Sequence, residues 1–332
     1  MRCATPWIRV RRNISMSLLE IKKLCVYFKT ARGMLRAVDD ISFTLEKGET
    51  LALVGESGSG KTMTSLAIMG LAGPSGIIPQ GEIIFNGINL LALPYSGMRQ
   101  VRGKKISMIF QEPMSSLNPV FTVGTQLAEA LLAHNECSKA EARRRSIDML
   151  VKTGIPEAEK RYDEYPHQLS GGMKQRVMIA MALLMNPEMV IADEPTTSLD
   201  VTIQAQIMEL LKSMQNKSGI SLLLISHDLS LVGEYADKVA VMYSGKICEY
   251  GTVRQVLENP VHPYTRGLLS CIPALHKTGE RLKSIPGSVV PSYSGTGCLF
   301  RMRCPEAQEI CKDRPGWKIL ACGTGCACHM RK

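Results

Sequence analysis

Apolar and polar residues alternate along two stretches near the beginning of the chain, residues 17–28 and 35–45. This period of two predicts half-buried β-strands. Residues 239–250 predict a hairpin that turns at Ser244-Gly245. Short apolar runs predict further strands that are buried on both faces, as in a parallel sheet, at residues 50–54, 105–110, 189–193 and 221–226.

Helices are predicted between these strands, over residues 61–71 and about 201–217. Strands that alternate with helices imply an α/β sheet. After residue 258 the composition shifts toward Pro, Gly and Cys and few periodic runs remain. This shift predicts a separate C-terminal extension.

The segment from about residue 112 to 186 has a different, helical character. Residues 138–141 form a capping box that opens a helix, and Gly154 ends it. A second helix begins after Ser170 and ends before Pro187, because proline cannot continue a helix. We therefore expect a helical insertion in the α/β core.

Length and composition restrict the class of protein. The chain has 332 residues, of which 45% are apolar and 21% are charged. This composition excludes a disordered protein and predicts roughly two domains. No apolar run approaches the ~18–20 residues that span a bilayer, so we expect a soluble chain, which can still attach to a membrane protein.

The net charge of +10 raises the question of nucleic-acid binding. Residues 1–15 carry four arginines and no acid, and residues 298–332 carry seven bases and three acids. Most of the excess charge therefore lies at the two ends, which favours solvated termini or attraction to acidic lipids over a nucleic-acid surface. Residues 1–15 form a basic tail, and Met16 is an alternative translation start.

Cysteines are concentrated at the C-terminus, where six of the eleven lie within the last 35 residues. The odd total and the absence of a secretory signal disfavour an extracellular disulfide framework. A metal or cluster site in a reducing compartment fits this distribution better.

Residues 55–62 read Gly-Glu-Ser-Gly-Ser-Gly-Lys-Thr, which matches the phosphate-loop pattern G-x-x-x-x-G-K-[ST]. Glycines let successive backbone N–H groups curl around phosphates, and the following helix start adds a positive dipole. Lys61 supplies a charge to the β- and γ-phosphates, and Thr62 offers its hydroxyl to Mg²⁺. By itself the motif leaves kinases, GTPases and motor ATPases open.

The apolar run at residues 189–193 ends in two adjacent carboxylates, Asp193 and Glu194. A strand parallel to residues 50–54 would place both beside the phosphate loop. Asp193 would then hold Mg²⁺, directly or through water, and Glu194 would act as general base on the attacking water. A solvated Asp-Glu turn is the alternative.

A second helix start that can bind an anion lies at residues 169–176, Leu-Ser-Gly-Gly-Met-Lys-Gln-Arg. Ser170 is a natural N-cap, and the two glycines that follow expose backbone N–H groups. An ordinary capped helix remains the alternative for this segment alone.

Together these motifs resemble the ATP-binding cassette (ABC) ATPases over about residues 17–258. The phosphate loop, Gln111, residues 169–176, Asp193-Glu194, residues 198–200 and Ser226-His227-Asp228 occur in that family's order. The resemblance implies a P-loop NTPase of RecA-like core with an antiparallel β subdomain and a helical signature subdomain at about residues 112–188. It assigns residues 16–258 to the ATPase domain and residues 259–332 to a loop-rich extension that contains the cysteines.

The resemblance also implies roles for individual residues. Gln111 touches Mg²⁺ and links to a membrane partner, and His227 binds the γ-phosphate. Phe28 takes the place of the adenine-stacking aromatic, with Tyr27 as a competitor. The ATP contacts of the same chain are Phe28, Gly55, Ser57, Gly58, Gly60, Lys61, Thr62 and Met63, and those supplied to the ATP of the opposite subunit are Ser170, Gly171, Gly172 and Asp200.

Residues 259–266, 285–287 and 297–305 resemble the importer subfamily for oligopeptides, dipeptides and nickel. Some members of this subfamily hold a [4Fe–4S] cluster, which the resemblance assigns to Cys298, Cys304, Cys311 and Cys328. Cys322 and Cys326 are alternatives for the fourth ligand. Zinc, free thiols and disulfides are alternatives to the cluster.

The resemblance implies an ATPase on the cytoplasmic face of the inner membrane that powers peptide import. Its expected partners are a second ABC ATPase in a heterodimer, two permease subunits and an external solute-binding protein, with no nucleic acid. Nickel or another small solute is the alternative cargo. A soluble ABC ATPase of DNA repair or translation, and an iron–sulfur enzyme that carries an ATPase, are the other classes.

Overall fold

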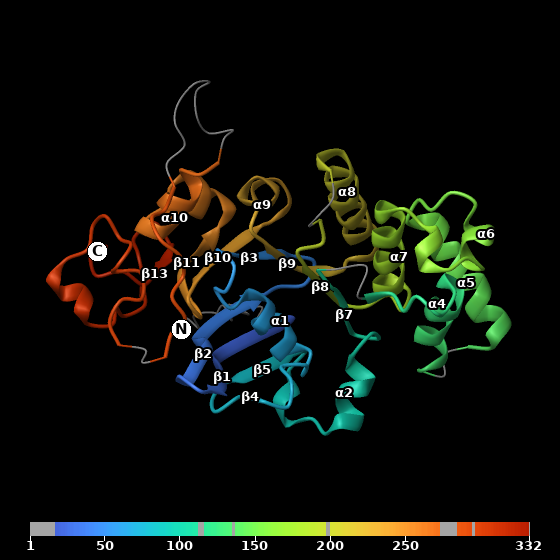
Figure 1. Ribbon diagram of the computed structural model, residues 1–332, viewed down its shortest axis with the longest axis horizontal. Helices are drawn as coiled ribbons and strands as arrows, with labels where there is room; N and C mark the ends of the chain where they lie inside the picture. Colours follow the sequence, from blue (N-terminus) through green and yellow to red (C-terminus); the bar gives the residue numbers. More distant parts are fainter. Residues whose placement is uncertain are drawn as a thin grey trace, which may run out of the picture.

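The computed structural model describes residues 17–111, 116–134, 137–196, 200–272, 284–293 and 296–331. The basic tail, Ser198 and Leu199 lie outside these ranges. Helices and strands form three regions: a central α/β core, an antiparallel β subdomain on one side and a helical subdomain at one end (Figure 1).

The described residues build a main sheet in the order β12-β13-β11-β10-β3-β9-β8-β7. Its strands are β3 (Thr50–Val54), β7 (Ile106–Ile109), β8 (Met189–Asp193), β9 (Ser221–Ser226), β10 (Lys238–Tyr243), β11 (Lys246–Thr252), β12 (Lys318–Ile319) and β13 (Gly325–Cys326). Strands β10, β3, β9, β8 and β7 run parallel, whereas β11, β13 and β12 are antiparallel to their neighbours.

A second, antiparallel sheet contains β2-β1-β5-β6, with β4 also paired to β1. Its strands are β1 (Leu19–Thr30), β2 (Gly33–Leu45), β4 (Gly76–Ile77), β5 (Glu82–Phe85) and β6 (Ile88–Asn89). The alternation that predicted strands at residues 17–28 and 35–45 is confirmed. Both strands extend about two residues beyond the predicted ranges at their hairpin end.

Helices surround the main sheet and fill the helical subdomain. They are α1 (Lys61–Ile68), α2 (Tyr95–Val101), α4 (Val123–Leu132), α5 (Lys139–Lys152), α6 (Ala158–Tyr162), α7 (Gly171–Leu183), α8 (Val201–Ser218), α9 (Leu229–Tyr235) and α10 (Pro263–Leu269). Shorter helical turns lie at Leu90–Ala92, Pro166–Gln168, Arg254–Glu258 and Glu309–Lys312. In the part of the chain that the structure describes, no helix is both long enough and apolar enough to cross a membrane.

Helix α1 is shorter than the predicted 61–71 because Gly70 adopts a left-handed conformation, with φ 63°. The backbone N–H of Leu71 donates to the carbonyl of Leu66 at 2.7 Å, which closes the C-terminal turn. The other predicted helix ends agree with the structure to within about two residues. Ser138 and Ser170 both act as N-caps, as predicted, since each hydroxyl accepts a backbone N–H bond.

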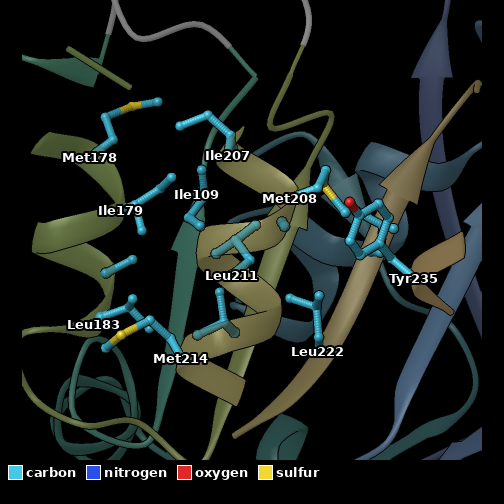
Figure 2. Packing of buried hydrophobic residues seen from close by; sticks show 14 of the residues in the cluster. Ile109, Met178, Ile179, Leu183, Ile207, Met208, Leu211, Met214, Leu222 and Tyr235 are labelled. Carbon is cyan, nitrogen blue, oxygen red and sulfur yellow. The ribbon is translucent and has the colours of Figure 1, made fainter. Parts of the chain in front are cut away.

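Two hydrophobic cores lie on opposite faces of the main sheet because successive residues of a strand point to opposite sides. On β3, Leu51 and Leu53 pack into the core shared with the antiparallel sheet and α1, whereas Ala52 and Val54 pack toward the helices. Figure 2 shows the helical side, where Leu211 of α8 lies between Ile179 of α7 and Leu222 of β9. These cores fix the sheet from which the site is built.

The C-terminal extension joins the main sheet rather than lying apart from it. Glu249 of β11 pairs with Cys326 of β13, which adds two short strands to the sheet edge. Tyr264, Leu269 and Phe300 belong to the same buried cluster as the core strands. Sequence periodicity could not predict this docking because the extension has little regular structure of its own.

Candidate active site

The phosphate loop connects the carboxyl end of β3 to the first residue of α1. Glycine is required at two of its positions. A Cβ atom on Gly55, where φ is 151°, would lie 2.2 Å from the carbonyl oxygen of Met242. One on Gly60, where φ is 106°, would lie 2.4 Å from the carbonyl oxygen of Ala37. The loop is therefore packed tightly against β10 and β2 with its backbone exposed to the cavity above.

Lys61 begins helix α1 and folds back over the loop. Its Nζ donates to the carbonyls of Gly55 at 2.8 Å and Glu56 at 3.0 Å. Burial lowers the pKa of Lys61, and the nearby carboxylates of Glu194, Asp193 and Glu56 oppose this shift. The ammonium group is thus held at the helix start, where an anion is favoured.

Thr62 and Asp193 come together from α1 and β8. The hydroxyl of Thr62 donates to Oδ1 of Asp193 at 3.2 Å. Burial raises the pKa of Asp193 to about 6, with the hydroxyl of Thr62 lowering it and the charge of Glu194 raising it further. A hydroxyl and a buried carboxylate side by side are the oxygen ligands that Mg²⁺ prefers.

Glu194 lies one residue further along, at the end of the same strand. Its Oε2 accepts a hydrogen bond from Nε2 of Gln111 at 2.9 Å and lies 3.3 Å from Nδ1 of His227. Parallel register explains this meeting, because β7, β8 and β9 all end at the same edge of the sheet. Gln111, Glu194 and His227, each of which follows a strand of this sheet, therefore converge.

A cavity of 360 Å³ lies above the phosphate loop and reaches Glu194. The predicted site residues that line it are Ser57, Gly58, Gly60, Lys61, Thr62, Met63, Gln111 and Glu194. Ser59 of the phosphate-loop motif also lines it. Additional lining residues, which sequence reasoning did not assign to the site, are Leu35, Arg36, Ala37, Ser244, Pro291 and Ser292.

The last two of these residues come from the C-terminal extension. The carbonyl of Ser292 accepts the backbone N–H of Arg36 at 2.9 Å, and the hydroxyl of Ser244 donates to the carbonyl of Val290 at 2.8 Å. These backbone contacts place the extension in the cavity wall. The Ser244-Gly245 turn was predicted, but no sequence signal indicates which distant segment covers it.

The predicted adenine-stacking residue, Phe28, does not line this cavity. It packs partly against the hydrophobic core and pairs in register with Leu35, which does line the cavity. The competing aromatic, Tyr27, donates its hydroxyl to Asp39 at 2.8 Å. The assignment of Phe28 therefore stays a prediction.

The predicted contacts to an opposite subunit lie away from this cavity. Ser170, Gly171 and Gly172 form the exposed or half-buried start of α7, and Asp200 caps α8 through the N–H of Ile203. None of the four is among the described residues that line the cavity above the phosphate loop, and their contact with a second chain stays a prediction.

Four of the cysteines in the extension line one small cavity: Cys298, Cys304, Cys311 and Cys328. All four are free thiols. Burial, with a smaller contribution from the neighbouring thiols, raises the pKa of Cys298 and Cys304. Within the described ranges, however, no group of three or more His, Cys, Asp or Glu side chains is arranged to hold a metal ion.

Two family models match the sequence. Residues 38–197 match the model described as ABC transporter, and residues 248–311 match the model described as oligopeptide/dipeptide transporter, C-terminal region. The first spans the phosphate loop and both strand-end carboxylates, and the second spans α10 and three of the four cavity cysteines.

Named proteins and a solved structure are similar to the chain. The dipeptide transport ATP-binding protein DppD of Escherichia coli is 48% identical over 95% of this chain and 97% of its own length. The oligopeptide transport ATP-binding protein OppD of the same organism is 49% identical over 98% of this chain and 96% of its own. The post-hydrolysis dimer of the ATP-binding cassette MJ0796 with ADP and Pi is 26% identical, with a TM-score of 0.64, over 71% of this chain and 99% of that one.

Proposed function

The chain belongs to the ATP-binding cassette transporter ATPases, and we propose that it hydrolyses ATP to power the import of peptides through membrane permease subunits. The observation that carries this proposal is the convergence of Gln111, Glu194 and His227 beside the phosphate loop. Similarity to dipeptide and oligopeptide transport ATP-binding proteins along nearly the whole chain supports the peptide cargo.

We propose a mechanism in which each of these side chains has one role. The backbone N–H groups of the loop and the ammonium of Lys61 bind the phosphates. Thr62, Asp193 and Gln111 would hold Mg²⁺, which neutralises charge that develops on the phosphates. Glu194 would accept the proton of the attacking water, and His227 would contact the γ-phosphate.

We assign the exposed start of α7 to the ATP of a second ATPase subunit. Ser170, Gly171, Gly172 and Asp200 would contact that nucleotide across a dimer. The support is that the start of α7 is exposed or half-buried and that none of the four is among the described residues that line the cavity above their own phosphate loop. ATP favours the closed dimer since its phosphates contact both chains, and phosphate loss opens it. The two subunits are proposed to be different chains.

The opening and closing of this dimer would drive two permease subunits, to which the ATPase attaches on the cytoplasmic face of the inner membrane. An external solute-binding protein would deliver the peptide. The relatives named as peptide transport ATP-binding proteins support this arrangement.

For the extension we propose a [4Fe–4S] cluster held by Cys298, Cys304, Cys311 and Cys328. The support is that these four free thiols line one cavity and that thiolate is the ligand of such clusters. Burial disfavours bare thiolates at Cys298 and Cys304, so a bound cation would offset the cost of their charge. The cluster would cross-link a region that has little regular structure.

Anaerobic purification followed by iron and sulfide assay tests this cofactor. We expect Cys304→Ser to lower bound iron, whereas the matched control Cys271→Ser, at an exposed thiol outside the cavity, leaves it unchanged. Colourless wild-type protein with stoichiometric zinc would refute the cluster.

Uptake of a labelled dipeptide by cells that lack this gene tests the transport function. The wild-type chain should restore uptake, and Glu194→Gln should not restore it. Normal dipeptide uptake in the deletion strain, with loss of a different solute instead, would reject peptide as the cargo.

A further inference from the structure

The C-terminal extension contacts the phosphate loop directly, through a paired charge. Nη1 of Arg303 lies 2.7 Å from Oε2 of Glu56, and Nη2 lies 2.9 Å from Oε1. Glu56 is the second residue of the phosphate-loop motif. The side chain of Arg303 is 6% exposed and that of Glu56 is 30% exposed. Such a bidentate ion pair fixes the orientation of the two side chains as well as their distance, because the planar guanidinium matches the geometry of the carboxylate.

Arg303 is itself held rigidly before it reaches the loop. Its Nε donates to the carbonyl of Pro286 at 2.7 Å and Nη2 donates to that of Gly287 at 3.2 Å. The guanidinium also lies over the ring of Tyr243, 5.8 Å from its centroid. The guanidinium therefore connects the extension, at Pro286-Gly287, both to strand β10 and to the phosphate loop.

A second residue of the extension contacts the backbone of Glu56. The N–H of Glu56 donates to the hydroxyl of Tyr264 at 2.9 Å, and Tyr264 is fully buried. The ring of Tyr264 packs against Tyr243, with centroids 4.7 Å apart, and against Phe300, with centroids 5.3 Å apart. Both the side chain and the backbone N–H of Glu56 are thus bound by the C-terminal extension.

Glu56 in turn influences the lysine that binds phosphate. Its carbonyl accepts a hydrogen bond from Nζ of Lys61 at 3.0 Å and the N–H of Ser59 at 3.2 Å. A displacement of Glu56 would therefore move the anchor of Lys61 and the turn that presents the loop's N–H groups. A loop already held in its binding conformation loses less entropy when phosphate binds.

We propose that Arg303 is a positioning residue of the ATP site, which acts through Glu56 to hold the phosphate loop in its binding conformation. The C-terminal extension then has two effects: it packs on the core, and it raises the affinity of the site for ATP. This inference rests on the proposed ATP-binding function. It predicts that loss of the Arg303–Glu56 pair weakens ATP binding without removing the groups that perform hydrolysis.

The test measures ATP affinity, KM and kcat of the full chain in its complex for wild type, Arg303→Lys, Arg303→Met and Glu56→Gln. We expect each variant to bind Mg·ATP about tenfold more weakly and to raise KM, with kcat at saturating ATP close to that of wild type. Arg266→Met is the matched control, because the hydrogen bonds of the Arg266 guanidinium go to Glu306 and to the carbonyl of Pro260 inside the extension. The Arg266→Met variant should bind ATP with the affinity of the wild type.

The double variant Arg303→Met, Glu56→Gln distinguishes positioning from a general role in docking the extension. If Arg303 acts through Glu56, the double variant should be no weaker in ATP binding than Arg303→Met alone. Additive losses, or wild-type affinity in Arg303→Lys and Glu56→Gln, would overturn the inference. Should Arg303→Met fail to fold, Arg303→Lys and Glu56→Gln decide alone. Absence of ATP binding by the wild type would instead reject the proposed function.

Discussion

Glu194 and His227 meet at the ends of neighbouring parallel strands, where Oε2 of Glu194 lies 3.3 Å from Nδ1 of His227. Glu194 has a positive φ of 47°, and its N–H donates to the carbonyl of Ile225 at 2.9 Å. This backbone conformation turns the carboxylate toward the cavity above the phosphate loop. The pair thus joins the end of β8 to the end of β9 beside the cavity above the phosphate loop, where we propose that water attacks ATP.

Replacement of Glu194 by Gln should abolish turnover while ATP still binds. Glutamine keeps the size of the side chain but cannot accept the proton, and loss of a general base typically costs about 100-fold or more in rate. Phosphate release and size measurement with Mg·ATP should show an inactive, ATP-trapped dimer. Glu188→Gln is the control, because Glu188 is exposed and precedes β8 at its opposite end. Unchanged turnover in Glu194→Gln would contradict its assignment as the base.

Replacement of Lys61 by Ala should weaken nucleotide binding. The variant loses the buried ammonium that lies against the loop carbonyls of Gly55 and Glu56. Loss of a hydrogen bond to a charged group corresponds to about 10- to 100-fold in affinity. Titration with a fluorescent ATP analogue measures the nucleotide affinity. Lys47→Ala is the control, because Lys47 is exposed. Equal affinity in Lys61→Ala and wild type would show that the phosphates bind elsewhere.

The buried His262 should make the folded protein less stable at mildly acidic pH. Burial lowers the pKa of His262 to about 4 from its ordinary 6.5, and the charge of Arg331 adds to this effect. Its Nδ1 accepts the N–H of Tyr264 at 3.1 Å, which a protonated ring cannot do. The unfolded chain therefore takes up the proton first, so stability is full above pH 6.5 and falls as the pH drops toward 4.

Urea unfolding at pH 7 and pH 5 measures this dependence. From pH 7 to pH 5, the free energy of unfolding of the wild type should fall by about 2 kcal/mol more than that of His262→Asn. Asparagine keeps an acceptor for the helix start but does not titrate in this range. The same loss in both proteins would show that other groups account for the acid sensitivity.

The sequence predicted most of the core correctly because its signals are local. Strands β3, β8 and β9 have the predicted bounds, since parallel strands that are buried on both faces appear as short apolar runs. Glu194 was predicted to lie beside the phosphate loop because it follows such a strand, whereas Gln111 and His227 were assigned through the resemblance to the ABC ATPases.

The contacts of the C-terminal extension could not be predicted in this way. Arg303 and Glu56 are separated by 247 residues. Periodicity shows which face of an element is buried but not which distant segment covers it. The same holds for Pro291 and Ser292, which reach the cavity through backbone contacts that leave no pattern in the sequence.

ATP hydrolysis by proteoliposomes that contain this chain, the proposed second ATPase and the permease subunits tests the central claim most directly. We expect the peptide-loaded binding protein to stimulate phosphate release from the wild-type complex, and Glu194→Gln in this chain to abolish that stimulation. Peptide-stimulated hydrolysis that persists at the wild-type rate in the Glu194→Gln complex would contradict the claim that this chain's ATPase site drives transport.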